Sequence, residues 1–349
     1  PAILPESVLD QASRDVIDLD QTGIGVLEHS HRGPAIDRIF EEAVADCREI
    51  GQIPDDFEIM FLQGGASLQF GMIPMGLLPP AGSADYIDTG SWTHKAIQDA
   101  SLVGNVNVIW SGKDDGYRCL PQTHELQFSA DAAYSYYCTN NTIYGTAWNA
   151  APSSKAPLIA DMSSDMFSRP IDWSKHDMVF AGAQKNIGPA GTTLVIMRRS
   201  LLNTVRKDLP SMLRYDIHAD KGSRYNTPPV FSIYCAGLVF KWIKSVGGLD
   251  VVATLNAQKA AIIYDAIDSS NGFYRPHAAP DCRSMMNIPF TTPSPDIDAA
   301  FISAADAEGM RSLKGHRSVG GIRASIYNAF PEEGCERLAA FMKSFAASC

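Results

Sequence analysis

The sequence predicts an α/β fold, in which a large domain with a mostly parallel central sheet is followed by a smaller α+β C-terminal domain. Segments with helical periodicity alternate with short apolar runs, which is typical of α/β proteins. These runs show no apolar–polar alternation, as expected for strands that are buried on both faces. The chain has 349 residues, which is enough for about two domains.

Helical periodicity is clearest in three segments. In residues 34–50, apolar side chains recur on one face, and Pro34 suits the first turn. A second helix is expected over residues 231–246, where Gly247 and Gly248 end the pattern. The last helix is expected from about residue 331 to about residue 345.

Six short apolar runs predict strands. They cover residues 58–62, 106–110, 134–138, 157–160, 178–180 and 192–197. Polar or glycine-rich segments follow four of these runs, at residues 64–67, 140–142, 161–164 and 184–188. Because ligands bind beyond the carboxyl ends of parallel strands, we expect a binding site where these four segments meet.

The composition of the sequence changes near residue 250. Gly and Pro then cluster over residues 269–295, which indicates a second, loop-rich unit. We therefore expect a large domain over residues 16–250. Residues 1–15 and 251–349 are expected to form the smaller domain.

Composition excludes several classes of protein. The 29 Lys and Arg against 39 Asp and Glu give a net charge of −10, so we expect no general nucleic-acid or membrane surface. The 7 cysteines form no CxxC pair, which predicts a reducing compartment and no zinc site. No apolar run approaches the roughly 18 residues of a transmembrane helix. The N-terminus has neither a signal-peptide pattern nor a starting Met, so we expect a trimmed chain.

Lys185 is the first candidate for chemistry. It comes directly after a predicted strand, in the small-residue setting Ala183-Gln184-Lys185-Asn186-Ile187-Gly188. It could be an ordinary solvated charge. Alternatively, it projects into a cleft, where partial burial would lower its pKa and make the amine a nucleophile that is fit for a Schiff base.

Asp161 ends another predicted strand and precedes Ser163 and Ser164. A carboxylate in this position is often a helix N-cap. The alternative is a partner for a buried cation. A strand-end Asp together with Lys185 fits a pyridoxal phosphate site, where the carboxylate would keep the pyridine nitrogen protonated.

Two further stretches are weaker candidates. The run Gln63-Gly64-Gly65-Ala66-Ser67 is either a plain strand-to-helix turn or an anion-binding loop at a helix N-terminus. Trp92 lies in a glycine-flanked loop. It is either a packing anchor or a surface on which a flat cofactor ring stacks.

Three arginines lie in glycine-flanked loops. Arg32 follows His31, Arg317 follows His316, and Arg323 follows Gly320-Gly321-Ile322. Individually these side chains are typical solvated charges. Together, in an acidic protein, they indicate capture of a carboxylate or a phosphate. A metal site is not expected, because His29 and His31 have no further ligand set nearby.

The residues described above carry a resemblance to a known family over nearly the whole chain. The matching stretches include GVLEHSHRG, FLQGGASLQF, ADYIDTGSWTHKA, VFAGAQKNIGPAGTTLVIMRR and GHRSVGGIRASIYNAF. The chain resembles the phosphoserine aminotransferase family, which is a class V, fold-type I group of pyridoxal phosphate enzymes. The resemblance implies the pyridoxal phosphate transferase fold of type I.

The resemblance also implies roles around the cofactor. Lys185 would bind the cofactor covalently and move the substrate α-proton, and Asp161 would face the pyridine nitrogen. The other residues implied to contact the cofactor are Ala66, Ser67, Trp92, Thr142, Gln184, Asn226 and Thr227. Asn226 and Thr227 would reach the cofactor phosphate from a neighbouring subunit, which implies a homodimer with shared sites.

For the substrates, the resemblance implies L-glutamate, 3-phosphohydroxypyruvate and O-phospho-L-serine. Arg323 matches the arginine for the α-carboxylate. The group implied for the substrate phosphate or the distal carboxylate of glutamate is His31, Arg32, His316 and Arg317. The expected activity is the transamination step of serine biosynthesis in the cytoplasm. The resemblance leaves open a second reaction, which gives 4-phosphohydroxy-L-threonine in vitamin B6 synthesis.

Three alternatives to this activity are open at this point. One is another class V aminotransferase, such as a serine–glyoxylate enzyme, which would not need two His-Arg pairs. A cysteine desulfurase is a further alternative, although none of the cysteines has a recognisable catalytic context. The third is a non-catalytic relative that binds pyridoxal phosphate.

Overall fold

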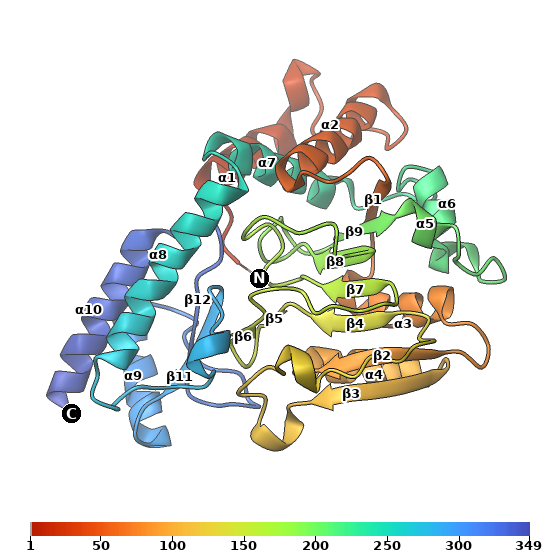
Figure 1. The fold of residues 1–349 in the computed structure, drawn as a ribbon. Coiled ribbons are helices and arrows are strands. Elements are labelled where there is room, and N and C mark those ends of the chain that lie inside the picture. Colours follow the sequence, from red (N-terminus) through yellow and green to blue (C-terminus); the bar gives the residue numbers. More distant parts are fainter. Residues whose placement is uncertain (1) are drawn as a thin grey trace.

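The computed structural model describes residues 2–349, and a seven-stranded sheet forms its centre (Figure 1). In spatial order the strands are β1 (Phe57–Leu62), β9 (Thr193–Arg198), β8 (Met178–Gly182), β7 (Leu158–Asp161), β4 (Ser135–Cys138), β2 (Ser83–Asp88) and β3 (Asn105–Ser111). The strands β8, β7, β4, β2 and β3 are parallel to one another. Only β9 runs antiparallel, to both β8 and β1. The prediction of a mostly parallel sheet is confirmed.

All six predicted strands are present, but β2 was not predicted. Its sequence, SADYID, contains two acidic residues that argue against a buried strand. Both carboxylates are nevertheless buried and fully engaged. Asp85 accepts hydrogen bonds from Ser129 and Asn107, and Asp88 accepts them from three hydroxyl groups. These long-range partners remove the cost of burying the charges.

Helices cover both faces of the sheet (Figure 1). One face carries α1 (Glu6–Ile17), α2 (Pro34–Gly51) and α7 (Val230–Ser245), and the other carries α3 (Gly65–Leu77) and α4 (Ser91–Ser101), with α6 (Tyr215–Asp220) near β1. Alternate residues of one strand enter the two cores. In β8, Val179 and Ala181 pack under α2 and α7, whereas Met178 and Phe180 pack under α3. This double burial explains the continuous apolar runs in the sequence.

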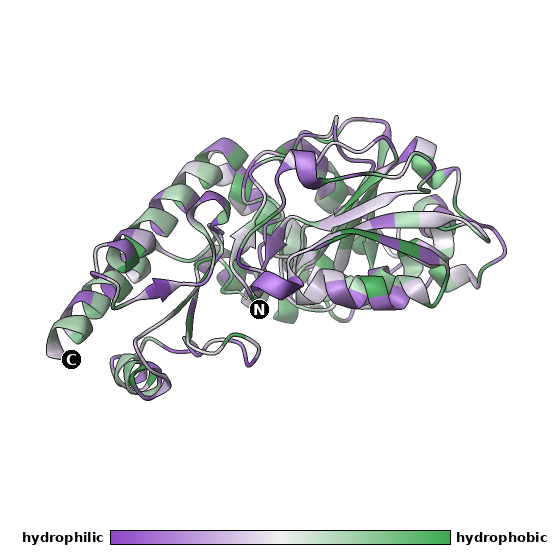
Figure 2. Cartoon of the chain, turned by 60° about the horizontal axis from the view of Figure 1, so that its bottom comes forward, coloured by the Kyte–Doolittle hydropathy of each residue, from purple (hydrophilic) through white to green (hydrophobic). Residues whose placement is uncertain are grey.

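The C-terminal part has a hydrophobic core of its own, beside the large sheet. It contains α8 (Leu249–Asp268), α9 (Pro295–Ala307), α10 (Glu332–Ser348) and the antiparallel strands β10 (Arg275–Pro276), β11 (Asn287–Thr291) and β12 (Ile322–Ser325). Hydrophobic and hydrophilic stretches alternate along the helix that ends at the C-terminus (Figure 2). Phe290, Phe301 and Phe341 pack together between the helices and the small sheet.

The remaining elements are short. They are the hairpin β5 (Asn140–Asn141) and β6 (Thr146–Ala147), the helix α5 (Arg199–Leu202) and the 3-10 turns η1 (Leu19–Gln21), η2 (Lys113–Asp115), η3 (Thr123–Glu125), η4 (Ser211–Leu213) and η5 (Pro280–Cys282). The hairpin β5–β6 lies between the large sheet and the C-terminal unit. It therefore stands where the two units meet.

The three predicted helices correspond to α2, α7 and α10, with ends that differ by a few residues. The domain limits, 16–250 for the large domain and 1–15 with 251–349 for the smaller one, stay a prediction, and Pro1 lies outside the described residues. Val8 and Ala12 of α1 pack into the core beneath α2 and α7. Within residues 2–349 no single helix is long and apolar enough to cross a membrane, although α7 and α8, bent by 86°, pass that test together.

Candidate functional site

A cavity of about 130 Å³ lies at the carboxyl ends of the parallel strands. It is lined by segments that follow β1, β4, β7 and β8, and by the start of α4. These are the segments expected from the sequence to meet. The cavity brings together the following residues predicted for a cofactor: Ala66, Ser67, Trp92, Thr142, Asp161, Gln184 and Lys185.

Lys185 is not a solvated surface charge, because its side chain lines this cavity. Its Nζ donates a hydrogen bond to Thr142 Oγ1 at 2.9 Å. Burial lowers the pKa of Lys185, while the nearby acidic groups, chiefly Asp161, oppose that shift and Arg323 adds to it. A lowered pKa leaves more of the amine neutral, and the neutral amine is the nucleophile.

Asp161 lies at the end of β7 and is almost fully buried. It does not cap a helix. Its Oδ1 instead accepts a hydrogen bond at 2.9 Å from the backbone N–H of Ser163, within a local turn. Burial raises the pKa of Asp161, and the hydrogen bonds of Ser163 and the charge of Lys185 lower it in part. Such a carboxylate is stabilised as an anion when a cation is brought to it.

The loop after β1 ends in the N-terminus of α3. Gly64 has a φ of 86°, and a Cβ there would lie 2.4 Å from the side chain of Leu68, so glycine permits this tight strand-to-helix turn. Backbone N–H groups in the first turn of a helix have no intrahelical acceptor. Ala66 and Ser67 lie in that turn and line the cavity. The arrangement suits an anion such as a phosphate.

Trp92 stands at the beginning of α4, against the same cavity. Gly90, two residues earlier, approaches the hairpin β5–β6 so closely that a Cβ would lie 2.8 Å from Asn141 Oδ1. This approach brings the indole near Thr142. The indole Nε1 is buried and has no hydrogen-bond partner in the described part of the chain. A flat ring placed in the cavity would have the face of an aromatic ring beside it.

Arg323 approaches Thr142 at this cavity from the other unit of the protein, and it lines the separate cavity of about 480 Å³. It lies on β12, and its guanidinium donates to the backbone carbonyl of Thr142 at 3.3 Å. Thr142 thus accepts hydrogen bonds from Lys185 on its hydroxyl and from Arg323 on its carbonyl. An arginine side chain next to a reactive amine is positioned to bind the carboxylate of an amino acid.

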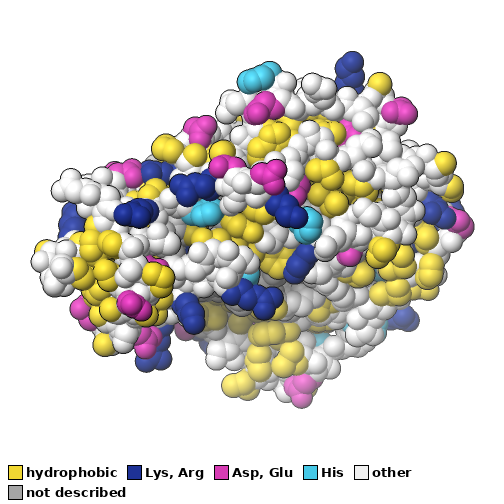
Figure 3. Space-filling model, turned by 90° about the horizontal axis from the view of Figure 1, so that it is seen from below, with side chains coloured by type: hydrophobic (Ala, Val, Ile, Leu, Met, Phe, Trp, Pro, Cys, Tyr) yellow, Lys and Arg dark blue, Asp and Glu magenta, His cyan; other side chains and the backbone are white. Residues whose placement is uncertain are grey.

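Positive charge extends from Arg323 toward the loop before β12. His316 has a lowered pKa because burial and the charges of Arg323, Arg317 and Lys95 all disfavour its protonation. Arg317 is exposed in the same loop. In the space-filling view, Lys and Arg side chains lie around a hollow on this face (Figure 3). A second anionic group on a substrate would be attracted here.

Comparisons with known proteins agree with this geometry. The aminotransferase class-V family model matches residues 1–338. A phosphoserine aminotransferase from Desulfotalea psychrophila is 48% identical over 348 residues, which is 100% of this chain and 96% of that relative. The chain belongs to the phosphoserine aminotransferase family.

Solved structures of the family have the same fold. The structure of the phosphoserine aminotransferase from Bacillus circulans subsp. alkalophilus has a TM-score of 0.98 and 46% identity, covering 100% of this chain and 97% of that one. The pyridoxal phosphate-bound enzyme from Trichomonas vaginalis has a TM-score of 0.94 and 39% identity, covering 98% of both chains. The prediction of fold type I is therefore confirmed, and the family assignment supports the main predicted activity over the alternatives.

Seven of the residues implied by the family resemblance do not line the cavity: His31, Arg32, Asn226, Thr227, His316, Arg317 and Arg323. Asn226 donates to Gln63 Oε1 at 3.2 Å, and Thr227 is exposed. His31 and Arg32 lie in the loop before α2. Their contribution to a shared site in a phosphoserine aminotransferase dimer stays a prediction.

Several polar residues around the cavity were not singled out by the sequence. Asn140 donates to Ser164 and to Asn287 Oδ1, and it accepts a hydrogen bond from Ser284. Asp165 is buried beside this cluster, and burial raises its pKa to about 6. Asn140 and Ser164 lie in the segments expected to meet, but the partners of Asn140 in the C-terminal unit lie more than 140 residues away, so no local pattern predicts them.

Proposed function

We propose that this chain transfers an amino group reversibly between L-glutamate and 3-phosphohydroxypyruvate, giving O-phospho-L-serine and 2-oxoglutarate in serine biosynthesis. The observation that carries the proposal is the meeting of Lys185 and Arg323 on the two acceptor groups of Thr142. It places a nucleophilic amine beside a carboxylate-binding side chain. The family assignment supports the phosphorylated substrate.

The residues around the cavity fit pyridoxal phosphate. A buried carboxylate, that of Asp161, suits a pyridinium nitrogen, and the amine of Lys185 suits the aldehyde carbon. The first turn of α3 offers N–H groups to the phosphate, and Trp92 offers an aromatic face to the ring. When bound, the cofactor supplies an electron sink that makes the substrate α-proton acidic.

The side chains of this protein then have separate tasks. Arg323 holds the α-carboxylate of the amino acid and so fixes the direction of the α C–H bond. Lys185 removes that proton at Nζ as a base and passes it on within the same half-reaction, and in the opposite half-reaction it delivers a proton to the α-carbon. Asp161 keeps a proton on the ring nitrogen through its negative charge.

The substrate phosphate is assigned to the basic loop before β12. His316 and Arg317 lie there, next to Arg323. His31, Arg32, Asn226 and Thr227 do not line the cavity within one chain. We assign them to the site of a neighbouring subunit, so that the active enzyme is a homodimer with shared sites. The cytoplasm is the compartment proposed for the reaction.

The test is the visible absorption spectrum of the protein after incubation with pyridoxal phosphate. A band from cofactor bound to Lys185 should form, and L-phosphoserine should remove it. L-Serine at the same concentration is the matched control and should remove the band much more weakly. Equal responses to both amino acids would overturn the assignment to a phosphorylated substrate, and the absence of any band would overturn the proposed activity.

A further inference from the structure

A second lysine is buried close to the site, outside the machinery described above. Lys259 lies in the middle of α8 and is 2% exposed. Its Nζ donates to four backbone carbonyls, those of Tyr327 at 2.8 Å, Phe330 at 3.1 Å, Asn328 at 3.2 Å and Ile326 at 3.3 Å. Among residues 2–349, no carboxylate forms an ion pair with it. Burying an ammonium group is costly, and here the four carbonyl hydrogen bonds offset that cost in place of an ion pair.

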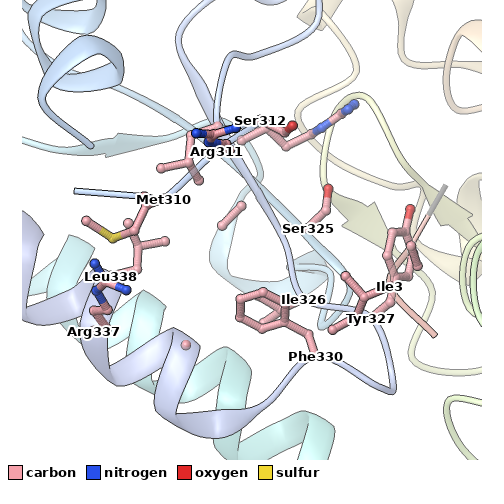
Figure 4. Close-up of a pocket in the computed structure, with 16 residues that line it drawn as sticks. Ile3, Met310, Arg311, Ser312, Ser325, Ile326, Tyr327, Phe330, Arg337 and Leu338 are labelled. Atoms are coloured by element: carbon pink, nitrogen blue, oxygen red, sulfur yellow. The ribbon is translucent and has the colours of Figure 1, made fainter. Parts of the chain in front are cut away.

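The four carbonyls belong to one short connection, residues 326–330, which we call the carbonyl turn. This turn joins β12, which carries Arg323, to the start of α10 at Glu332. A cavity of about 480 Å³ borders it on one side. In the close-up of that cavity, Ile326, Tyr327 and Phe330 line the wall (Figure 4). Ile326 and Tyr327 are themselves buried, so the cavity leaves only part of the turn open, and the hydrogen bonds of its backbone hold the rest in place.

Those other contacts lead to the reactive lysine. The backbone N–H of Asn328 donates to Asn186 Oδ1 at 3.1 Å, and its side chain donates to the carbonyl of Phe167 at 2.8 Å. Asn186 is the neighbour of Lys185 in the sequence. The carbonyl turn therefore connects the strand that carries Arg323 with the segment that carries Lys185. Lys259, on α8, binds the carbonyl groups of this turn.

We propose that Lys259 is a positioning residue, which holds the carbonyl turn so that Arg323 faces Lys185 across the substrate site. The inference rests on the proposed function, because it takes Arg323 as the group that binds the α-carboxylate. An ammonium group has three protons and a charge, and both favour the convergence of several carbonyl dipoles. A neutral side chain of similar length cannot replace these contacts.

Carboxylate binding should also depend on whether Lys259 is protonated, because the charged form holds the carbonyl turn more firmly. Burial lowers its pKa to about 8, and the groups on α10 that face it, Cys335 and Glu332, favour the charged form in part. Above that pH the amine keeps only two protons and loses its charge. The carbonyl turn is then held less firmly, so carboxylate binding should weaken as the pH rises past about 8.

The first test replaces the ammonium by an apolar group of similar length, in Lys259→Met holoenzyme. We expect the absorption band of the bound cofactor to stay, while the KM for L-glutamate rises between about tenfold and a hundredfold. Ile263→Val is the matched control, because Ile263 is fully buried one turn further along the same helix. A variant Lys259→Met with the KM of wild type would overturn the proposal, as would an equal rise in the control.

The second test compares wild type with Lys259→Met and uses glutarate, a dicarboxylate without an amino group, as the probe. Its inhibition constant against wild-type holoenzyme should rise as the pH passes about 8, and in Lys259→Met this rise should be absent. A constant that stays flat in wild type, or that rises equally in the variant, would overturn the proposal. If wild-type enzyme fails to respond to L-glutamate at all, the proposed function fails, and this result is distinct from either outcome for Lys259.

Discussion

Two lysines lie near the substrate site, Lys185 half-buried and Lys259 fully buried, and their surroundings differ. Lys185 has one hydrogen-bond partner, Thr142 Oγ1, and lines an open cavity. Lys259 has four carbonyl partners and almost no exposure. Burial lowers the pKa of both side chains.

The comparison shows that a lowered pKa does not by itself make a lysine reactive. A lysine whose protons are all engaged by backbone oxygens has no free direction for attack. A lysine with a single hydroxyl partner and an adjacent cavity can exchange that partner for a substrate carbon. The shift in pKa is thus shared by a catalytic and a positioning group, and only the geometry around Nζ tells them apart.

The largest expected effect is that of Lys185→Ala. Removing the amine should lower transamination at least about a thousandfold, because both the covalent link and the proton carrier are lost. The fold should survive, which circular dichroism and thermal melting can check. Lys175→Ala, at an exposed lysine, is the matched control and should keep full activity. Turnover near wild type in Lys185→Ala would contradict the mechanism.

Asp161→Asn should lower turnover by about a hundredfold or more, because the ring nitrogen loses its anionic partner. In the cofactor-free protein, the same change tests how Asp161 affects the pH dependence of stability. Burial raises the pKa of Asp161 in the folded state above its unfolded value, so the folded state binds the proton more tightly. The stability contributed by this group therefore falls as the pH rises from the usual Asp range through the raised pKa.

Asparagine cannot ionise, so the Asp161→Asn protein should lack that slope when its thermal midpoint is followed against pH. Asp114→Asn, at an exposed position, should keep the slope of wild type. If the thermal midpoint of Asp161→Asn keeps the wild-type dependence on pH, the Asp161 carboxyl group does not have the raised pKa that its burial implies.

Arg317→Ala should weaken phosphoserine more than unphosphorylated amino acids. The loss of one charge-assisted contact costs about 1.5–3 kcal/mol, which corresponds to a rise in KM of about ten- to a hundredfold. Arg311→Ala removes an exposed arginine that lies nearby in the sequence and lines the other cavity, and it should leave the phosphoserine KM unchanged. An equal loss for phosphoserine and alanine would remove the phosphate role from Arg317.

The smallest expected effect is that of Thr142→Val, which removes the acceptor for Lys185 and keeps the carbonyl that meets Arg323. About 0.5–1.5 kcal/mol is at stake, so turnover should fall by about tenfold at most, with little change in glutamate KM. Thr142→Ser should restore the turnover. A large rise in KM for the valine variant would show that the two contacts cannot be separated.

The sequence predicted those parts of the fold and site that depend on neighbours along the chain. Apolar runs marked the strands, and the residues at their ends, Asp161 and Lys185, were recognisable because strand ends collect on one edge of a parallel sheet. The sequence did not predict features that depend on partners far away along the chain. The strand β2 hides two aspartates whose donors lie up to 44 residues away, and its sequence alone reads as polar.

The double role of Thr142 and the cage around Lys259 have the same origin. Arg323 lies 181 residues from Thr142, and the carbonyls around Lys259 lie 67 to 71 residues away. No local pattern encodes such a pairing. Lysine in the middle of an amphipathic helix ordinarily predicts a solvated charge, so only the packing of α8 against the carbonyl turn revealed it.

The most direct test of the distinction between the two lysines is to trap the cofactor on the protein. Holoenzyme is treated with borohydride, digested, and the modified peptide is identified by mass spectrometry. We predict the pyridoxyl group on Lys185 alone, with Lys259 unmodified even at high pH, where both amines are neutral. Modification of Lys259, or of any lysine in place of Lys185, would contradict the account.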